Sequence, residues 1–191
     1  MVKKFYFIAI EGLDGSGKGT VSKKLSKELN CKLYVTPPYP FNQIKIDIDK
    51  NTNSEARFFF YLASILHASK ELRQILKRNH VVCDRYIYST VCYHFALNPN
   101  LAYFDIIHLD ILRPDFVFYL NASYEERVRR IAKRENRKIE DVMNDKYGNR
   151  DFLFKVEKEY GRFKEINKID TENRTVDEIV TQIKEIIGGG K

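Results

Sequence analysis

Short apolar runs alternate along this chain with longer segments in which apolar residues recur every three to four positions. The apolar runs predict buried strands at 5–10, 32–36, 81–84, 115–120 and 166–169. The helical periodicity predicts helices at 21–29, 55–78, 87–97, 103–112, 123–134, 151–163 and 175–187. Strand and helix alternate from one end to the other, which predicts a three-layer α/β fold with a roughly five-stranded parallel sheet.

No linker, repeat or low-complexity stretch interrupts this alternation, so the 191 residues are expected to form a single domain, 1–191. Three prolines, Pro37, Pro38 and Pro40, exclude regular structure after the second strand and predict a rigid loop that lines a pocket. The segment 135–147 is charged and poor in aliphatic residues, which predicts a mobile lid at about 134–148 that is too polar to pack. The end of the chain, 188–191, is expected to fray.

The turn between the first strand and the first helix has the composition of a phosphate-binding loop. Its residues are Gly12, Leu13, Asp14, Gly15, Ser16, Gly17, Lys18, Gly19 and Thr20. Glycines allow a tight turn whose N–H groups, together with the helix N-terminus, form an anion site that Lys18 completes. A hydroxyl that holds Mg²⁺ usually follows the lysine directly, but here Gly19 does. We therefore expect Thr20 to bind a phosphate oxygen, and Mg²⁺ to depend on water and another carboxylate.

A second candidate element, Asp84-Arg85-Tyr86, follows the buried strand at 81–83. In a doubly wound sheet the carboxyl ends of the strands face the ligand crevice, so these residues are placed toward a ligand. A structural ion pair between Asp84 and Arg85 is the alternative. Adjacent residues of an extended chain point to opposite faces, which disfavours that pair.

Composition narrows the function classes. The net charge of +7 suits nucleic acid, a membrane surface or a polyanionic small ligand, and the scattered basic residues favour the small ligand. Cys31, Cys83 and Cys92 have no metal-binding spacing, so we expect free thiols in a reducing compartment. No apolar run has membrane-spanning length and no secretion signal is recognised, so the cytoplasm is the expected location.

Four segments together resemble the thymidylate kinase family of P-loop nucleoside monophosphate kinases. They are 11–18, the Asp-Arg-Tyr segment 84–93, the Pro-Asp strand 113–120, and Asp145-Lys146-Tyr147 followed by Phe152 and Tyr160. The resemblance implies that the γ-phosphoryl group of ATP is transferred to dTMP, giving dTDP, with Mg²⁺ as cofactor. It also implies a homodimer, with no nucleic-acid or membrane partner.

The resemblance implies roles for residues around the phosphates. Lys18 would bridge the donor and acceptor phosphates, and Asp14 would contact the acceptor sugar and orient its phosphate. Arg85 would hold the acceptor phosphate, and Asp84 would hold Mg²⁺ through water. Gly15 occupies a position where some family members carry a catalytic arginine, so the lid is expected to supply that cation from Arg134 or Arg137.

At the nucleoside, the resemblance implies that Phe60 stacks on the base and that Tyr93 crowds the 2′ position, favouring deoxyribose. Ser89 and Tyr147 belong to the matching substrate-binding segments. Ser64 stands where the family has an arginine that reads the thymine edge, and the loop 37–41 lacks the family's phosphate-binding arginine. These departures predict relaxed base selectivity that admits dUMP and dCMP, with Lys45 assisting Arg85.

Two other functions stay open at this point. A deoxynucleoside kinase shares the Asp/Glu-Arg-aromatic segment, would phosphorylate a nucleoside 5′-hydroxyl, and needs no additional arginine for an acceptor phosphate. A non-catalytic nucleotide-binding protein would also fit the positive charge. The presence of Lys18, Asp84 and Arg85 favours an enzyme.

Overall fold

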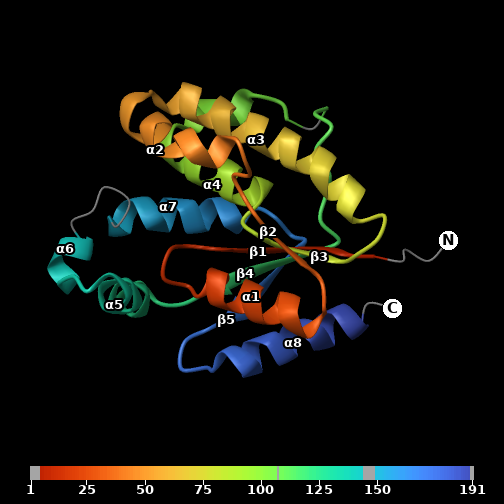
Figure 1. The fold of residues 1–191 in the computed structure, drawn as a ribbon. Helices are drawn as coiled ribbons and strands as arrows, with labels where there is room; N and C mark the ends of the chain where they lie inside the picture. Colours follow the sequence, from red (N-terminus) through yellow and green to blue (C-terminus); the bar gives the residue numbers. More distant parts are fainter. Residues whose placement is uncertain (1–4, 107, 144–148, 190–191) are drawn as a thin grey trace.

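A computed structural model describes residues 5–106, 108–143 and 149–189, and it contains one parallel sheet (Figure 1). The strands are β1 (Phe7–Gly12), β2 (Lys32–Val35), β3 (Val81–Asp84), β4 (Phe116–Asn121) and β5 (Ile166–Asp170). Their order is β2-β3-β1-β4-β5, and every neighbouring pair is parallel. The predicted three-layer α/β fold with a five-stranded parallel sheet is therefore confirmed.

Helices cover both faces of the sheet. On one face lie α1 (Lys18–Glu28) and α8 (Val176–Gly189), and on the other lie α3 (Ser54–Ile75), α4 (Ile87–Leu97) and α7 (Arg150–Tyr160) (Figure 1). The helix α2 (Phe41–Asn51) packs on α3. The helices α5 (Tyr124–Glu135) and α6 (Ile139–Met143) lie beyond the carboxyl ends of the strands.

Each face of the sheet has its own apolar core, because successive strand residues point to opposite faces. Phe7 and Ala9 belong to the core under α3, α4 and α7, whereas Ile8 and Ile10 belong to the core with α1 and α8. All four side chains are at most 1% exposed, as expected for a strand covered on both faces. The central strand is therefore fixed from both sides, and the loop that follows it starts from a rigid position.

Two helical regions differ from the prediction. The sequence analysis missed α2, because Ile44, Ile46 and Ile48 alternate with polar residues in a pattern that resembles a strand. None of the residues of α2 is fully buried. In the predicted helix at 103–112, the described residues contain only the end of a 3₁₀ helix, Pro99–Tyr103. Its apolar residues Ile106, Leu109 and Ile111 instead pack on the core from an irregular segment.

Two segments that were expected to be mobile or frayed differ from that expectation in their described residues. Gly188 and Gly189 form the last turn of α8 instead of a frayed end, while 190–191 lie outside the described residues. Within the lid segment, Val142 of α6 is 2% exposed and packs on Val128 and Ala132. The lid was expected to be too polar to pack, and that interpretation is wrong at this residue.

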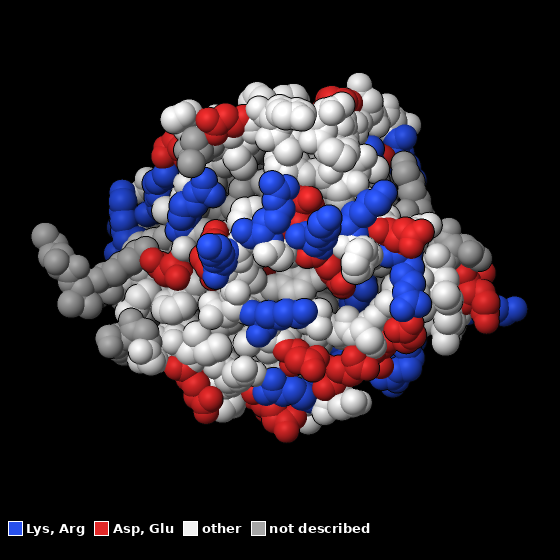
Figure 2. Space-filling model, turned by 180° about the vertical axis from the view of Figure 1, so that it is seen from behind, with Lys and Arg blue, Asp and Glu red and all other residues white. Residues whose placement is uncertain are grey.

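Figure 2 shows Lys and Arg side chains across the middle of one face, mixed with Asp and Glu. None of the helices that the structure describes is long and apolar enough to span a membrane. The register pairs Ile10 with Asp84 and Gly12 with Leu120, so the phosphate-binding loop and Asp84 leave the sheet side by side.

Candidate active site

The phosphate-binding loop has the backbone conformation that its glycines predict. Gly12, Gly15 and Gly17 have φ angles of 142°, 82° and 95°, and Gly17 is the N-terminal cap of α1. A Cβ atom on Gly15 would lie 2.5 Å from the carbonyl oxygen of Arg127. Only glycine fits this position, because both the left-handed backbone and the contact with α5 exclude a side chain.

Lys18 is folded back over this loop. Its Nζ donates to the carbonyl oxygen of Leu13 at 2.7 Å and lies 3.8 Å from Oδ1 of Asp14. Burial, together with the nearby Arg85 guanidinium, lowers the pKa of Lys18 to about 7, against the opposite effect of Asp14 and Asp84. Phosphate oxygens in the loop would favour the charged ammonium, so anion binding and protonation of Lys18 support each other.

Arg85 is held in a strained conformation at the end of β3. Its φ angle is 66°, in the left-handed region that residues other than glycine seldom occupy. Its backbone N–H donates to Ile10, and its guanidinium donates to Asp14, to Ser89 Oγ at 3.3 Å and to the Gly12 carbonyl at 3.4 Å. Its ion-pair partner is Asp14 rather than Asp84, so the structural pair between adjacent residues is not formed.

Asp14 completes this charged pair. Desolvation raises the pKa of Asp14, but Arg85 and Lys18 outweigh it and hold the pKa below its usual value. Asp14 is therefore ionised at neutral pH and orients the guanidinium beside the loop.

Asp84 is the carboxylate that could hold a hydrated Mg²⁺. Its Oδ2 lies 3.4 Å from the position of a Cβ on Gly19, so the carboxylate lies directly over the loop. Asp84, Lys18 and Thr20 line the same cavity, which gives a carboxylate and a hydroxyl oxygen beside the expected phosphates. Mg²⁺ usually keeps several waters and takes one or two carboxylates plus phosphates, so these residues fit it. No cluster of three or more His, Cys, Asp or Glu within the described ranges forms a full protein cage.

Glu11 is a site residue that the sequence analysis did not single out. Its carboxylate is fully buried and accepts hydrogen bonds from Tyr86 N at 2.8 Å, Ser89 N at 3.4 Å, Ser89 Oγ and Tyr160 Oη at 3.0 Å. It thereby satisfies the N–H groups of Tyr86 and Ser89 at the start of α4, where the Tyr86 side chain does not cap the helix and its hydroxyl pairs with Ser69 Oγ at 2.6 Å instead. Burial raises the pKa of Glu11, and these donors oppose that effect.

Two cavities meet at the loop. The first, of about 660 Å³, is lined by residues of the loop, α1, Asp84 and α5. The second, of about 300 Å³, lies between the loop and α2, α3, α4 and α7. Asp14 and Arg85 line both, so a molecule in each cavity would present its end to the same pair of side chains.

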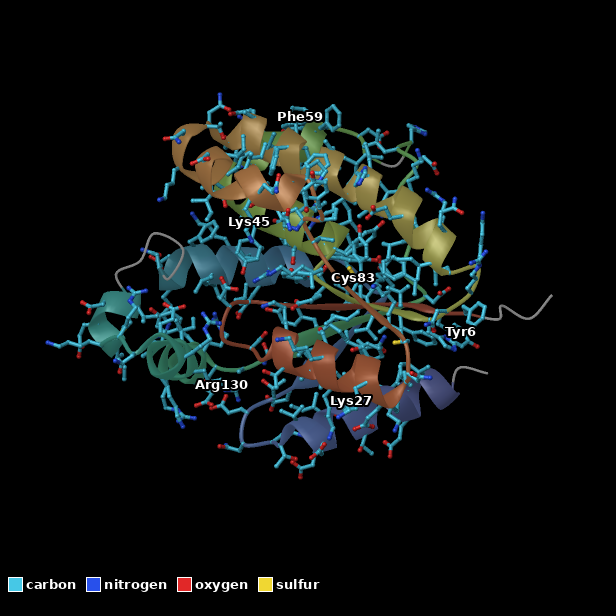
Figure 3. All side chains as sticks on the ribbon, viewed as in Figure 1. Tyr6, Lys27, Lys45, Phe59, Cys83 and Arg130 are labelled. Atoms are coloured by element: carbon cyan, nitrogen blue, oxygen red, sulfur yellow. The ribbon has the colours of Figure 1, made fainter. Side chains whose placement is uncertain are left out.

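The second cavity contains some of the predicted acceptor residues. Ser89 and Tyr93 line it, as do Lys45 and Phe152, and Figure 3 shows Lys45 on α2. The Arg85 guanidinium lies 5.7 Å from the centre of the Tyr93 ring. Tyr147, another predicted substrate-binding residue, lies outside the described residues.

Phe60 and Ser64 are not brought to this cavity. Phe60 packs against Phe41, with ring centres 5.6 Å apart, and the buried Ser64 donates to the carbonyl oxygen of Tyr61 at 2.7 Å. Arg57 and Tyr61, one helical turn apart on α3, line the cavity instead. A shift of one residue rotates the exposed face of a helix by about 100°. Arg57 therefore gives this pocket an arginine besides Arg85, at a position that the sequence analysis did not single out.

Of the two arginines predicted to supply positive charge from the lid, only one lines the loop-side cavity. Arg134 lines the loop-side cavity, whereas Arg137 is not among the residues that line it and donates to Glu135 and to the Asp141 carbonyl. Arg130, which sequence reasoning did not select, also lines the cavity and lies between α5 and α1 in Figure 3. It donates to the Gly15 carbonyl at 3.4 Å and to Thr171, after β5. Ser123 Oγ caps α5 by accepting from the N–H of Glu126 at 3.3 Å, and the Glu126 carboxylate pairs with Arg129 and Arg130.

A parallel α/β sheet, a glycine-rich phosphate loop and a second cavity beside it define a P-loop nucleotide kinase. The model of the family Thymidylate kinase matches residues 10–183. The chain belongs to the thymidylate kinase family, whose members are ATP-dependent phosphotransferases.

Known proteins agree with this assignment over nearly the whole chain. A protein of Methanococcus aeolicus named "Probable thymidylate kinase" is 31% identical, and one of Methanocaldococcus jannaschii with the same name is 30% identical. Each alignment covers 93% of both chains. Thymidylate kinase of Candida albicans has a TM-score of 0.74 at 23% identity, over 97% of this chain and 92% of that one. Deoxyadenosine kinase of M. mycoides has a TM-score of 0.66 at 23% identity, over 96% and 99%. At these identities the two structures support the fold.

Proposed function

We propose that this protein transfers the γ-phosphoryl group of ATP to the phosphate of dTMP, giving dTDP and ADP. The observation that carries the proposal is the shared border of the two cavities, where Asp14 and Arg85 line both. ATP in the loop-side cavity would direct its outer phosphate toward this border, and dTMP in the other cavity would direct its phosphate toward it. Family membership and the names of the full-length relatives support the same reaction.

Phosphoryl transfer requires mainly positioning and the neutralisation of charge. Lys18, after exchanging the Leu13 carbonyl for phosphate oxygens, would neutralise the transferred group. Arg85 can hold the acceptor phosphate bidentately, because Asp14 and Ser89 fix the plane of its guanidinium. Arg134, and Arg130 beside it, would add positive charge on the donor side.

Mg²⁺, when bound, would supply positive charge that offsets the negative charge of the ATP phosphates. Asp84 would hold it through water, and Thr20 would bind a phosphate oxygen. Tyr93 would limit the space at the sugar 2′ position. We also propose that the protein forms a homodimer, and this proposal is based only on the family resemblance.

A deoxynucleoside kinase is the alternative, and the fold similarity to deoxyadenosine kinase keeps it testable. The acceptor cavity favours a phosphorylated substrate, since Lys45 and Arg85 give it two cationic side chains that could hold a phosphate.

ADP release with Mg-ATP, measured for dTMP, dUMP, dCMP, UMP and thymidine, decides between the two. We expect kcat/KM to be highest for dTMP. A preference for thymidine over dTMP would overturn the monophosphate kinase, and the absence of turnover with any acceptor would overturn the enzyme.

A further inference from the structure

The end of the acceptor cavity formed by α2, α3 and α4 contains a histidine with one defined hydrogen-bonding role. His94 lines the cavity and is 7% exposed. Its Nδ1 lies 2.7 Å from the carbonyl oxygen of Thr90, one turn earlier on α4. A carbonyl oxygen only accepts, so Nδ1 must carry a proton and donate it. The polar atom that the ring can offer to a bound molecule is therefore Nε2.

The surroundings keep this ring neutral. Burial lowers the pKa of His94, the nearby Arg57 guanidinium lowers it further, and the Thr90 carbonyl and Asp49 act in the opposite direction. A neutral imidazole protonated at Nδ1 has a lone pair at Nε2, which makes this atom a hydrogen-bond acceptor. Nε2 has no hydrogen-bond partner among the residues that the structure describes.

Positive charge lies beside this acceptor. Arg57 lines the same cavity, is 7% exposed, and donates from Nη1 to the Asp49 carbonyl at 3.4 Å. Tyr61 donates to both carboxylate oxygens of Asp49, at 3.1 and 2.9 Å, and its ring centre lies 5.5 Å from that of His94. Helices α2, α3 and α4 thus hold one fixed acceptor and one cationic donor next to an aromatic ring.

We infer that His94 and Arg57 read the base of the acceptor nucleotide, with His94 Nε2 accepting the N3–H of thymine and Arg57 donating to an adjacent carbonyl oxygen. Thymine and uracil present an N–H flanked by two carbonyl acceptors. Cytosine keeps the O2 carbonyl but has an unprotonated N3 and an amino group in place of O4. Nε2 would then face a second acceptor and, where Arg57 reads O4, the guanidinium would face a second donor. The inference rests on the proposed function, and it replaces the expected tolerance of dCMP by selectivity for 2,4-dioxopyrimidines.

The test uses dTMP and its N3-methyl analogue, which lacks only the donated hydrogen and carries a methyl group in its place. For the unmodified protein we expect kcat/KM to be about 100-fold or more lower for the analogue, because the acceptor is left unpaired. dCMP should be disfavoured to a similar degree. Equal use of dTMP and N3-methyl-dTMP would overturn the inference while leaving dTMP phosphorylation established. No turnover of dTMP would instead overturn the proposed function on which it rests.

Variants then assign the acceptor atom. His94→Phe keeps the ring volume and removes the acceptor, so the preference for dTMP over the analogue should fall about tenfold or more, mainly through KM. His94→Gln places an amide oxygen near the Nε2 position and should restore part of the preference. Thr90→Val is the matched control, since it removes a hydroxyl in the same cavity and retains the carbonyl that binds Nδ1. Loss of the preference in Thr90→Val, with His94→Phe unchanged, would show that Thr90 is the reader and overturn the assignment.

Protonation gives an independent measurement. Below its lowered pKa, His94 gains a proton at Nε2 and turns from acceptor to donor, so KM for dTMP should rise at acid pH. The substrate phosphate also titrates, with a second pKa near 6. The His94→Gln variant keeps the titrations of the substrate phosphate and of Lys18 but lacks that of His94, so the difference between the two profiles isolates His94. Identical profiles would contradict the assignment.

Discussion

The two ends of the ligand site are built differently. The phosphate end consists of one continuous loop and the turn after β3. Both are attached to central strands whose side chains, apart from Asp84 at the end of β3, are buried. The base end is formed by side chains from α2, α3 and α4, which meet only when three helices pack. The positions of the phosphate-end side chains are set by residues that are contiguous in the sequence. Those of the base-end side chains depend on how each helix is rotated about its own axis. The first is therefore expected to tolerate little change, and the second to be the place where substrate preference is set.

The largest effect should come from the phosphate end. Lys18→Ala should lower kcat/KM by about 10³-fold or more, since the ammonium neutralises charge that develops during transfer. The melting temperature should stay the same or rise, because the buried charge is desolvated in the fold. Steady-state kinetics and a thermal melt test this. The control is Lys23→Ala, an exposed lysine that borders the same cavity. Turnover retained in Lys18→Ala would remove the lysine from the mechanism.

Arg85→Lys sharpens the comparison, because Arg85 serves both cavities. A lysine keeps the charge but loses the planar, bidentate donor, so KM for dTMP should rise about 100-fold while KM for ATP changes much less. Kinetics with each substrate varied in turn separate these effects. An equal rise in both KM values would mean that Arg85 does not distinguish the acceptor phosphate.

The lid should give an intermediate effect that depends on the residue. Arg134→Ala should lower kcat about tenfold or more with little change in acceptor KM, because Arg134 lines the loop-side cavity. Arg137→Ala should lower kcat by less than about twofold, because the Arg137 side chain binds Glu135 and the Asp141 carbonyl instead of lining the cavity. Single-turnover assays of both variants test the ranking. A larger loss in Arg137→Ala would show that the lid closes with a different face toward ATP.

The smallest effects are expected at the base end, where substitutions of Phe60 and Tyr61 should change KM for dTMP to different extents. Tyr61→Phe removes the hydroxyl that binds Asp49, so we expect a loss of about 1 kcal/mol in stability and a severalfold rise in KM for dTMP. Phe60→Leu should leave KM within about twofold, since Phe60 packs on Phe41 outside the cavity. Denaturant unfolding and kinetics measure both. A rise in KM only in Phe60→Leu would restore Phe60 as the base-contacting residue.

The same difference explains what the sequence could predict. Strand–loop–helix order, the loop from Gly12 to Thr20 and the position of Asp84 follow from local patterns, and the structure contains all three. Glu11 was not recognised as a positioning residue, because its partners lie far away in the sequence. Arg57 and Tyr61 could not be distinguished from Phe60 and Ser64, because a spacing along the chain does not give the rotation of α3 around its axis. The alternating isoleucines of α2 concealed the helix that contributes Lys45 and Asp49.

Glu11 has a consequence for how the site forms during folding. The carboxylate oxygens of Glu11 accept hydrogen bonds from Tyr86, Ser89 and Tyr160, and so join β1 to residues that are 75, 78 and 149 positions away in the sequence. Contacts between such distant residues form late, after the loop-closure entropy has been overcome. Since Tyr160 belongs to α7, we expect the hydrogen-bond network of Glu11 beside Arg85 to be complete only after α7 has packed. A partly folded or nascent chain can contain the whole phosphate-binding loop without an assembled acceptor site, so recovery of kinase activity on refolding should coincide with the final docking of α7.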